Sequence, residues 1–461
     1  MEQTLGSAER PVRVAIIGAG PSAFYAADGL LQNKTVHFAV DMFDRKPTPF
    51  GLVRDGVAPD HQKIKSVTRV YDKTASHPRY RFFGNVTFGR DITLDDLKKY
   101  YDQIIFAVGA QSDRRMGVPG EDLEGSYPAT VFVAWYNGHI DYSHLDFDLS
   151  QESVAIIGQG NVAIDVTRIL AKSPEELAVT DIADHALERL RHSKIKKIYV
   201  IGRRGPAQAA FTNVELRELG ELDVAELIVN PAELELDPAS EASLANDRVA
   251  AKNVEILREN ATKERANKER QIEIRFLRSP VEVIGENGKV TAIKLQKNIL
   301  QQKEDGSIVA VGTDEYEILP VGLVFRSIGY KGAPLEGVPY DDRKGTIPNT
   351  LGRIINNGEP VVGQYVVGWA KRGPSGIIGT NKPDSLETVK QMVADLEAGV
   401  ITPASADACQ IEELLKERNV RYVSFAEWKR LDEVETSRGQ AQGRPRVKFT
   451  KVKDMLDHLD S

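Results

Sequence analysis

The sequence has 461 residues, a formal net charge of −7 at neutral pH, 41% apolar residues and one cysteine, Cys409. This length predicts two or more domains, the acidic balance argues against a nucleic-acid partner, and the single cysteine excludes an internal disulfide, a CxxC redox pair and a cysteine-ligated iron–sulfur cluster. No apolar run approaches the roughly 20 residues of a membrane span. The single cysteine suits a reducing compartment, and we expect the cytoplasm.

The first predicted unit is a strand, a glycine turn and a helix in RVAIIGAGPSAFYAADGLL, residues 13–31. In this G-x-G-x-x-A turn, Gly18 permits the tight bend and Gly20 leaves room for a pyrophosphate. The following helix directs its N-terminus at the phosphates. The next predicted strand ends on Asp44, whose carboxylate can accept hydrogen bonds from ribose hydroxyls. These residues predict a dinucleotide site.

The same pattern returns in SVAIIGQGNVAIDVTRILA, residues 153–171, with the turn beginning at Gly158. Two copies in strand–turn–helix context are much stronger evidence than one. The next recognisable strand ends in Arg203 and Arg204, at the position where a carboxylate usually meets a free ribose. Guanidinium groups form charge-assisted, bidentate bonds with phosphate. The second site is therefore expected to prefer NADP(H), and the first site suits the unphosphorylated ribose of FAD.

Two further predicted strands end in glycine, in residues 102–110 and 322–330, and close a nucleotide domain beside a crossover. They predict an α/β fold with two Rossmann-like, tandem dinucleotide-binding domains, one inserted in the other. The first domain comprises 1–110 and 330–461, including a C-terminal extension, and the insert comprises 111–329.

Less regular segments follow within the insert and after it. Residues 231–275 are charged and predict a solvated helix or a mobile insertion. Residues 272–300 alternate well enough for a small antiparallel hairpin. Residues 364–399 predict a strand that runs into Trp369, then a glycine-rich loop and a helix. Trp369 can cover a planar ring, although filling a domain interface is the more frequent role of tryptophan.

Several long segments together resemble one family. They are PTPFGLVRDGVAPDHQKIKSV (47–67), FFGNVTFG (82–89), FVAWYNGH (132–139), IGQGNVAIDVTRIL (157–170), VIGRRGPAQAAFTNVELREL (200–219) and GWAKRGPSGIIGT (368–380). The chain resembles the bacterial branch of the NADPH–ferredoxin reductases of the adrenodoxin reductase type. The resemblance implies a flavoprotein that passes a hydride from NADPH to FAD and then single electrons to a ferredoxin-type iron–sulfur protein. FAD would bind the first domain and NADP the second.

The resemblance also implies roles for individual residues. In addition to Gly18 and Gly20, the implied FAD contacts are Ser22, Asp44, Leu52, Phe88, Trp369, Gly376, Ile377 and Ile378. The implied NADP contacts are Gln159, Gly160, Asn161, Val162, Arg203, Arg204 and Glu215, with Gly376 touching both cofactors. His61 and Asp165 match positions near the meeting point of nicotinamide and flavin. The family often has glutamate at Asp44 and a smaller aliphatic residue at Phe88, so a contact at Phe88 would be through the backbone.

The sequence excludes some alternative functions and leaves others open. The cysteine count removes a thioredoxin-reductase-like disulfide reductase and a glutamate-synthase-type small subunit. An FAD/NADPH oxidoreductase with a quinone or similar small acceptor stays open, as does a non-enzymatic nucleotide-sensing Rossmann protein. No HExxH or short Cys/His cluster supports a metal site. Arg217 and the Lys371–Arg372 pair are candidates for a basic face that meets an acidic ferredoxin.

Overall fold

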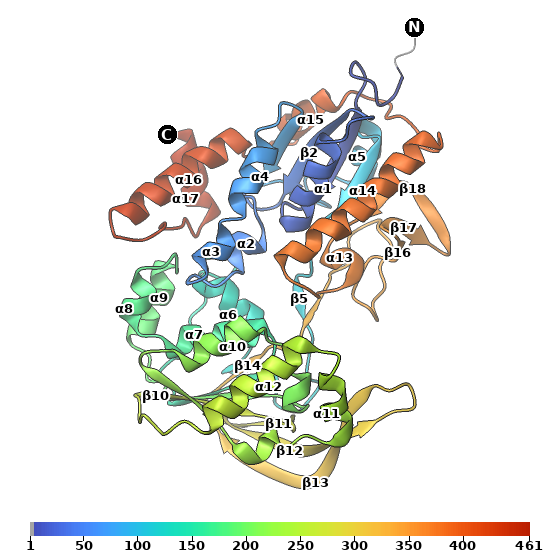
Figure 1. Cartoon of the computed structure of the whole chain (residues 1–461). Helices are drawn as coiled ribbons and strands as arrows, with labels where there is room; N and C mark the ends of the chain where they lie inside the picture. Colours follow the sequence, from blue (N-terminus) through green and yellow to red (C-terminus); the bar gives the residue numbers. More distant parts are fainter. Residues whose placement is uncertain (1–3) are drawn as a thin grey trace.

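Residues 4–461 are described by a computed structural model in which two parallel β-sheets form two lobes (Figure 1). The first lobe, at the top of Figure 1, contains the strands of residues 12–106 and 349–366. The second lobe, below it, contains the strands of residues 126–326. The predicted α/β fold with two Rossmann-like units is confirmed. In sequence, the second lobe lies between the two parts of the first.

The first lobe is built on a seven-stranded sheet in the order β16-β17-β18-β4-β1-β2-β3. Its strands are parallel from β18 to β3 and antiparallel at the β16–β17–β18 edge. The strands are β1 (Val12–Ile17), β2 (Phe38–Asp44), β3 (Tyr80–Gly84), β4 (Gln103–Phe106), β16 (Asn349–Thr350), β17 (Arg353–Asn356) and β18 (Glu359–Val366).

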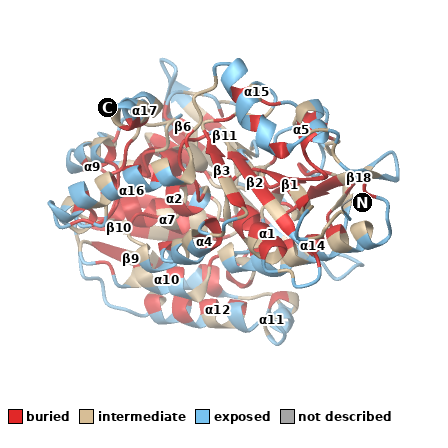
Figure 2. Ribbon diagram, turned by 90° about the horizontal axis from the view of Figure 1, so that it is seen from above, coloured by how far each residue is buried: buried red, intermediate tan, exposed pale blue. Residues whose placement is uncertain are grey.

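Helices cover both faces of this sheet because successive residues of a strand point to opposite sides. Val14 and Ile16 of β1 pack into one hydrophobic cluster, and Ala15 and Ile17 pack into another. The first cluster is closed by α1 (Pro21–Leu31), α4 (Thr68–Ala75), α14 (Asn381–Glu397), α16 (Phe425–Gln440) and α17 (Val452–Asp460). The second is closed by α5 (Leu94–Tyr100), α13 (Trp369–Arg372) and α15 (Ile411–Glu417). Figure 2 shows buried strands beneath helices with exposed outer faces.

The second lobe has a six-stranded sheet in the order β6-β14-β7-β8-β10-β9, parallel throughout. Its strands are β6 (Ser126–Pro128), β7 (Ser153–Ile157), β8 (Lys197–Ile201), β9 (Ala225–Val229), β10 (Arg270–Arg275) and β14 (Leu323–Arg326). One face packs on α6 (Ala129–Tyr136), α7 (Asn161–Ala171), α8 (Pro174–Ala178), α9 (Asp184–Arg191), α10 (Asn213–Gly220) and α12 (Arg248–Ala261). The other face packs on an antiparallel sheet of β11 (Arg278–Glu286), β12 (Lys289–Gln302) and β13 (Ile308–Pro320).

Two sequence predictions in the insert need correction. The predicted hairpin exists as β11–β12, with Asn287 and Gly288 at positive φ in its turn. Its expected first part, residues 272–275, belongs instead to β10 of the parallel sheet, where it is paired on both sides. The segment predicted to be solvated or mobile forms α11 (Pro238–Leu244) and α12, and α12 buries Leu257 completely in the core of the lobe.

Short elements connect the lobes. Strands β5 (Ser112–Asp113) and β15 (Tyr330–Lys331) pair antiparallel beside the two crossings of the chain. Helices α2 (Leu52–Asp55) and α3 (Gln62–Lys65) lie at the lower end of the first lobe in Figure 1. No helix in the described part of the chain has both the length and the apolar character needed to cross a membrane.

The C-terminal segment fastens the two lobes together. The Arg444 guanidinium donates to the carbonyl of Thr180 over 3.0 Å. The Lys448 ammonium donates to the carbonyl of Asn137 over 3.1 Å and to that of Arg54 over 3.0 Å. Burial lowers the pKa of Lys448 to about 7. The basic stretch of residues 444–449 therefore contacts residues of both lobes.

Candidate dinucleotide sites and the charged cluster between them

The first glycine turn lies between β1 and α1. Gly18 has a φ of +103°, and a Cβ there would lie 2.5 Å from the carbonyl oxygen of Ala107, so only glycine fits. Gly20 is the N-cap of α1 and supplies no side-chain cap to the first turn. Within residues 4–461, no atom lies within 4 Å of a Cβ built on Gly20. The amides at this helix start therefore face open space, which suits a phosphate.

The second glycine turn, between β7 and α7, repeats this geometry. Gly158 has a φ of +129°, and a Cβ there would lie 2.0 Å from the carbonyl oxygen of Ser327. Gly160 is the N-cap of α7, again without a side-chain cap. A Cβ on Gly160 would meet no described protein atom within 4 Å. Both turns thus combine one glycine required by the protein backbone with one that leaves space above a helix N-terminus.

The predicted FAD residues near the first turn have distinct surroundings. Asp44 accepts the backbone N–H groups of Ala19 and Lys46, each over 2.9 Å, and so fixes the turn to the end of β2. Ser22 is buried, and a Cβ on Gly368 would lie 2.5 Å from its hydroxyl oxygen. The structure thus brings the first turn next to the start of the Trp369 loop. A contact of Asp44 with ribose stays a prediction.

The remaining predicted FAD residues combine aromatic rings with exposed apolar side chains. Phe88 packs edge-on against Phe106, with ring centroids 5.6 Å apart. Trp369 lies against Tyr330 at 5.2 Å and donates its indole N–H to the carbonyl of Ser375. Leu52 and Ile377 leave 43% and 65% of their surface exposed, and Gly376 and Ile378 belong to the same loop as Ile377. Leu52 and Ile377 are both among the exposed large apolar side chains of the described residues.

The predicted NADP residues gather around the second turn. Gln159 donates its amide to the carbonyl of Arg275 over 3.0 Å, and Asn161 accepts the backbone N–H of Thr212 over 2.8 Å. Val162 is partly buried against the core of the second lobe. Gln159 and Asn161 thus bind the turn to the neighbouring loops, and Gly160 lies between these two residues in the chain.

Arg203 and Arg204 follow the end of β8 and are both exposed. Across residues 4–461 neither guanidinium forms a salt bridge. Partial burial, together with the neighbouring charge of Arg203, lowers the pKa of Arg204. Two adjacent guanidinium groups without a carboxylate partner form a ready site for a phosphate.

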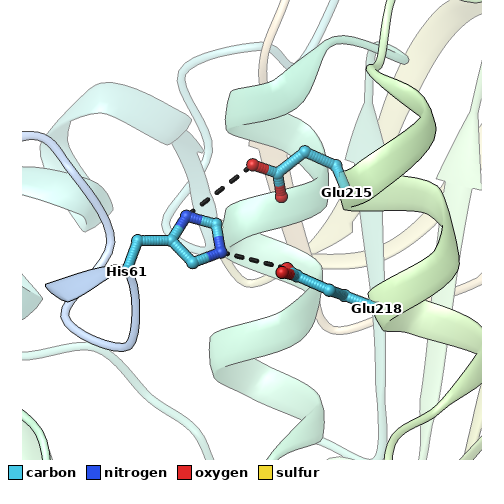
Figure 3. A group of neighbouring side chains, drawn as sticks. All are labelled: His61, Glu215 and Glu218. Carbon is cyan, nitrogen blue, oxygen red and sulfur yellow. Dashed lines mark hydrogen bonds and ion pairs between the residues drawn. The ribbon is translucent and has the colours of Figure 1, made fainter. Parts of the chain in front are cut away.

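The predicted pair His61 and Asp165 belongs to a larger charged cluster, of which Figure 3 shows His61, Glu215 and Glu218. His61 Nε2 lies 3.0 Å from Glu218 Oε2, and His61 Nδ1 lies 3.7 Å from Glu215 Oε1. Asp165 Oδ1 is more distant, 3.9 Å from His61 Nδ1. His61 comes from the segment before α3, whereas both glutamates come from α10 of the second lobe. The structure thus places Asp165 near His61 and adds Glu215, which was predicted only as a nucleotide contact, and Glu218, which was not predicted.

Burial and neighbouring charges shift the acidity of this cluster. Burial, reinforced by the Asp165 carboxylate, raises the pKa of Glu215 to about 7. Burial also raises the pKa of Asp165. Although burial opposes a charged imidazolium, the hydrogen bond with Glu218 raises the pKa of His61 above its ordinary value. Burial thus moves the pKa of the Glu215 carboxyl toward neutral pH.

Sequence analysis missed Arg168, whose guanidinium donates to Asp165 over 2.6 Å and to Glu215 over 2.7 Å. His61, Glu215 and Glu218 have ligand atoms close enough to hold a metal ion. However, Arg168 already supplies a cation to these carboxylates, so we interpret the group as an ion-pair network. A signal existed in the sequence, since Asp165 and Arg168 are spaced i, i+3 on the helix predicted after the second glycine turn.

The chain is similar in sequence to known proteins. Residues 12–200 match the family described as pyridine nucleotide-disulphide oxidoreductase. NADPH-ferredoxin reductase FprA of Mycobacterium tuberculosis is 47% identical over 456 residues, covering 97% of this chain and 99% of the relative. The mitochondrial NADPH:adrenodoxin oxidoreductase of Arabidopsis thaliana is 42% identical over 464 residues, covering 98% of this chain and 96% of the relative.

A solved structure gives the same result in three dimensions. Mycobacterium tuberculosis FprA in complex with NADPH matches with a TM-score of 0.92 and 46% identity, covering 98% of this chain and 100% of that chain. The likeness extends over both lobes and both glycine turns. The chain belongs to the family of NADPH–ferredoxin reductases of the adrenodoxin reductase type.

Proposed function

We propose that the protein is a flavoprotein reductase that passes electrons from NADPH, through FAD, to a ferredoxin-type iron–sulfur protein. The observation that carries this function is the pair of open glycine turns in one chain, of which the second is followed by two unpaired arginines. The similarity to NADPH–ferredoxin reductases along nearly the whole chain supports it. A reducing compartment, the cytoplasm, is the location we propose.

The first lobe fits FAD. The space above Gly20 and the uncapped start of α1 suit a pyrophosphate, and the exposed side chains of Leu52 and Ile377 suit an apolar ring system. Residues 1–110 and 330–461 would form this domain. The residues that would hold FAD are Gly18, Gly20, Ser22, Asp44, Leu52, Phe88, Trp369, Gly376, Ile377 and Ile378. Bound FAD supplies the step from two-electron to one-electron chemistry that joins a hydride donor to an iron–sulfur protein.

The second lobe, within residues 111–329, fits NADP(H). The start of α7 would bind the pyrophosphate through backbone N–H groups, beside Gln159, Gly160, Asn161 and Val162. Arg203 and Arg204 would hold the 2′-phosphate, because nothing else in the described chain neutralises them. Glu215 would contact the nicotinamide end from α10.

His61 and Asp165 would act at the nicotinamide end of the site. Hydride transfer needs no general acid, so their task is to orient groups and to exclude or place water. The neighbouring Glu215, whose pKa is about 7, gives this end of the site a proton that it can hold or release at neutral pH. Asp165 and Glu215 lie on different helices, and both approach Nδ1 of His61, at 3.9 Å and 3.7 Å.

A ferredoxin is usually acidic, so a basic face should receive it. Lys371 and Arg372, one of the two candidates from the sequence, are unsuited to this role. Lys371 is only 7% exposed and pairs with Asp384 and Glu387. Arg217, on α10, remains exposed, and no salt bridge engages it within the described residues. We therefore assign the basic contact to the α10 side of the second lobe.

The purified protein tests this function directly. It should carry flavin absorption in the visible range and should reduce a [2Fe–2S] or [4Fe–4S] ferredoxin with NADPH. A quinone, offered in parallel, should be reduced more slowly at the same concentration. A colourless protein that binds NADPH without oxidising it would contradict the proposal and favour a nucleotide sensor. Rapid quinone turnover without ferredoxin reduction would favour the small-molecule acceptor.

A further inference from the structure

The buried Arg168 side chain connects the two lobes. Its Nε donates to Asp60 Oδ2 over 2.7 Å, and its Nη2 donates to Asp60 Oδ1 over 3.1 Å. The Arg168 guanidinium is 1% exposed. It also contacts three carboxylates of the second lobe, at Asp165, Glu215 and Glu218.

These carboxylates come from different parts of the fold. Asp60 precedes His61 directly in the segment between α2 and α3, which belongs to the first-lobe part of the chain. Asp165 lies on α7, the helix that begins at the second glycine turn, and Glu215 lies on α10. A planar guanidinium with five donors can satisfy several carboxylates in one fixed geometry, which a lysine cannot do. Arg168 thus ties the peptide that carries His61 to the two helices that face it.

The charges around His61 show why one cation must occupy this place. Four carboxylates, at Asp60, Asp165, Glu215 and Glu218, lie around the imidazole and the guanidinium. The other cation of the group is Lys172, whose Nζ lies 2.9 Å from Asp60 Oδ2. The hydroxyl of Tyr136, which is fully buried, also faces the group. Without Arg168, several buried carboxylates would lack compensation, which is costly in a dry environment.

We propose that Arg168 is a positioning residue of the reductase. By holding Asp60 of the first lobe against Glu215 and Asp165 of the second, it fixes where His61 stands between the two nucleotide turns. This inference rests on the proposed function and deepens it. Arg168 is not among the residues predicted to contact FAD or NADP. It would therefore affect flavin reduction through His61 and the carboxylates that it binds.

Two substitutions separate the charge of Arg168 from its shape. Arg168→Lys keeps the positive charge but loses the planar guanidinium with its five donors. Arg168→Gln loses both the charge and the guanidinium. Both should slow flavin reduction at saturating NADPH by about tenfold or more, because small displacements of a positioning group cost large factors in rate. Asp60→Asn keeps Arg168 and removes its anchor on the first lobe. It should give a loss of the same size.

The titration of His61 provides a second measurement, which does not depend on enzyme turnover. His61 can be followed by NMR in protein labelled at the histidine Cε1, and His61→Gln assigns its signal. The Arg168 guanidinium lies 3.5 Å from His61 Nδ1 and disfavours the imidazolium. Arg168→Gln should therefore move the titration of His61 to higher pH, whereas Arg168→Lys should leave it near its original position.

Arg10→Gln is the matched control. Arg10 forms a bidentate ion pair with Asp102, whose side chain is 0% exposed, and no residue of the charged cluster takes part. It should lower stability without changing flavin reduction or the His61 titration. The inference is overturned if Arg168→Lys and Asp60→Asn keep the wild-type rate within about twofold, or if Arg168→Gln leaves the His61 titration unmoved. Absence of ferredoxin reduction by the wild-type protein would instead contradict the proposed function alone.

Discussion

Arg203 and Arg204 are the side chains to which we assign the choice between NADPH and NADH. A double substitution to alanine removes two charge-assisted contacts with the 2′-phosphate, each worth about 1.5–3 kcal/mol. Because every 1.4 kcal/mol is about tenfold, we expect kcat/KM for NADPH to fall by about 100- to 10,000-fold and that for NADH to change little. Steady-state kinetics with both coenzymes measure this. Equal losses with both would mean that the phosphate binds elsewhere.

Glu215 gives the second prediction, because its raised pKa links stability to pH. Burial of its carboxylate raises the folded-state pKa to about 7 from the ordinary value of 4.5. A raised pKa means that the stabilisation is present below 4.5 and is lost as pH rises through 7. Glu215→Gln mimics the protonated form, so its stability relative to wild type should improve between pH 5 and 8 by on the order of 1 kcal/mol.

Thermal unfolding of both proteins at these two pH values provides the measurement for Glu215. Glu218→Gln is a suitable comparison, since the hydrogen bond with His61 lowers the pKa of Glu218 and predicts the opposite trend. A difference between Glu215→Gln and wild type that stays constant with pH would show that the carboxyl ionises normally in the folded protein.

In each strand–turn–helix element, one glycine of the turn is needed for folding and another is needed for ligand binding. A Cβ at Gly158 would collide with the carbonyl of Ser327, whereas a Cβ at Gly160 would meet open space. Gly160→Ala should therefore keep the melting temperature and weaken NADPH binding by about tenfold or more. Gly158→Ala should lower the melting temperature itself. Calorimetry and NADPH titration distinguish the two, and a destabilised Gly160→Ala protein would contradict this division.

These elements were predictable because their signals are local. The G-x-G-x-x-A turns were recognisable from adjacent residues, and the structure places each between a buried strand and a helix. Residues 272–275 were assigned to a hairpin because alternation alone does not distinguish an antiparallel strand from β10. The bond between Asp60 and Arg168 spans 108 positions, so only the tertiary fold could reveal it. The contacts with the two cofactors stay predictions.

The whole molecule works, in our account, as two lobes held at a fixed distance while an acidic carrier docks on a basic face. Despite its net charge of −7, the protein should lose ferredoxin reduction as salt rises from 0.05 to about 0.5 M, because exposed charges are screened beyond about 10 Å at 0.1 M. Arg217→Glu should lower kcat/KM for ferredoxin and leave flavin reduction by NADPH unchanged.

Lys303→Glu makes the same charge change at an exposed position of the β12–β13 turn and serves as the control. It should behave as wild type. Ferredoxin reduction that ignores salt, or equal losses in the two variants, would remove the assigned docking face.

The most direct test of the central claim is rapid mixing of the oxidised protein with NADPH and with NADH, following the flavin absorption. The account predicts that both coenzymes reduce the flavin, that NADPH does so at far lower concentration, and that added ferredoxin then reoxidises it. A flavin that is reduced equally well by both coenzymes at equal concentrations would contradict the claim that the second glycine turn and its two arginines select the phosphorylated coenzyme.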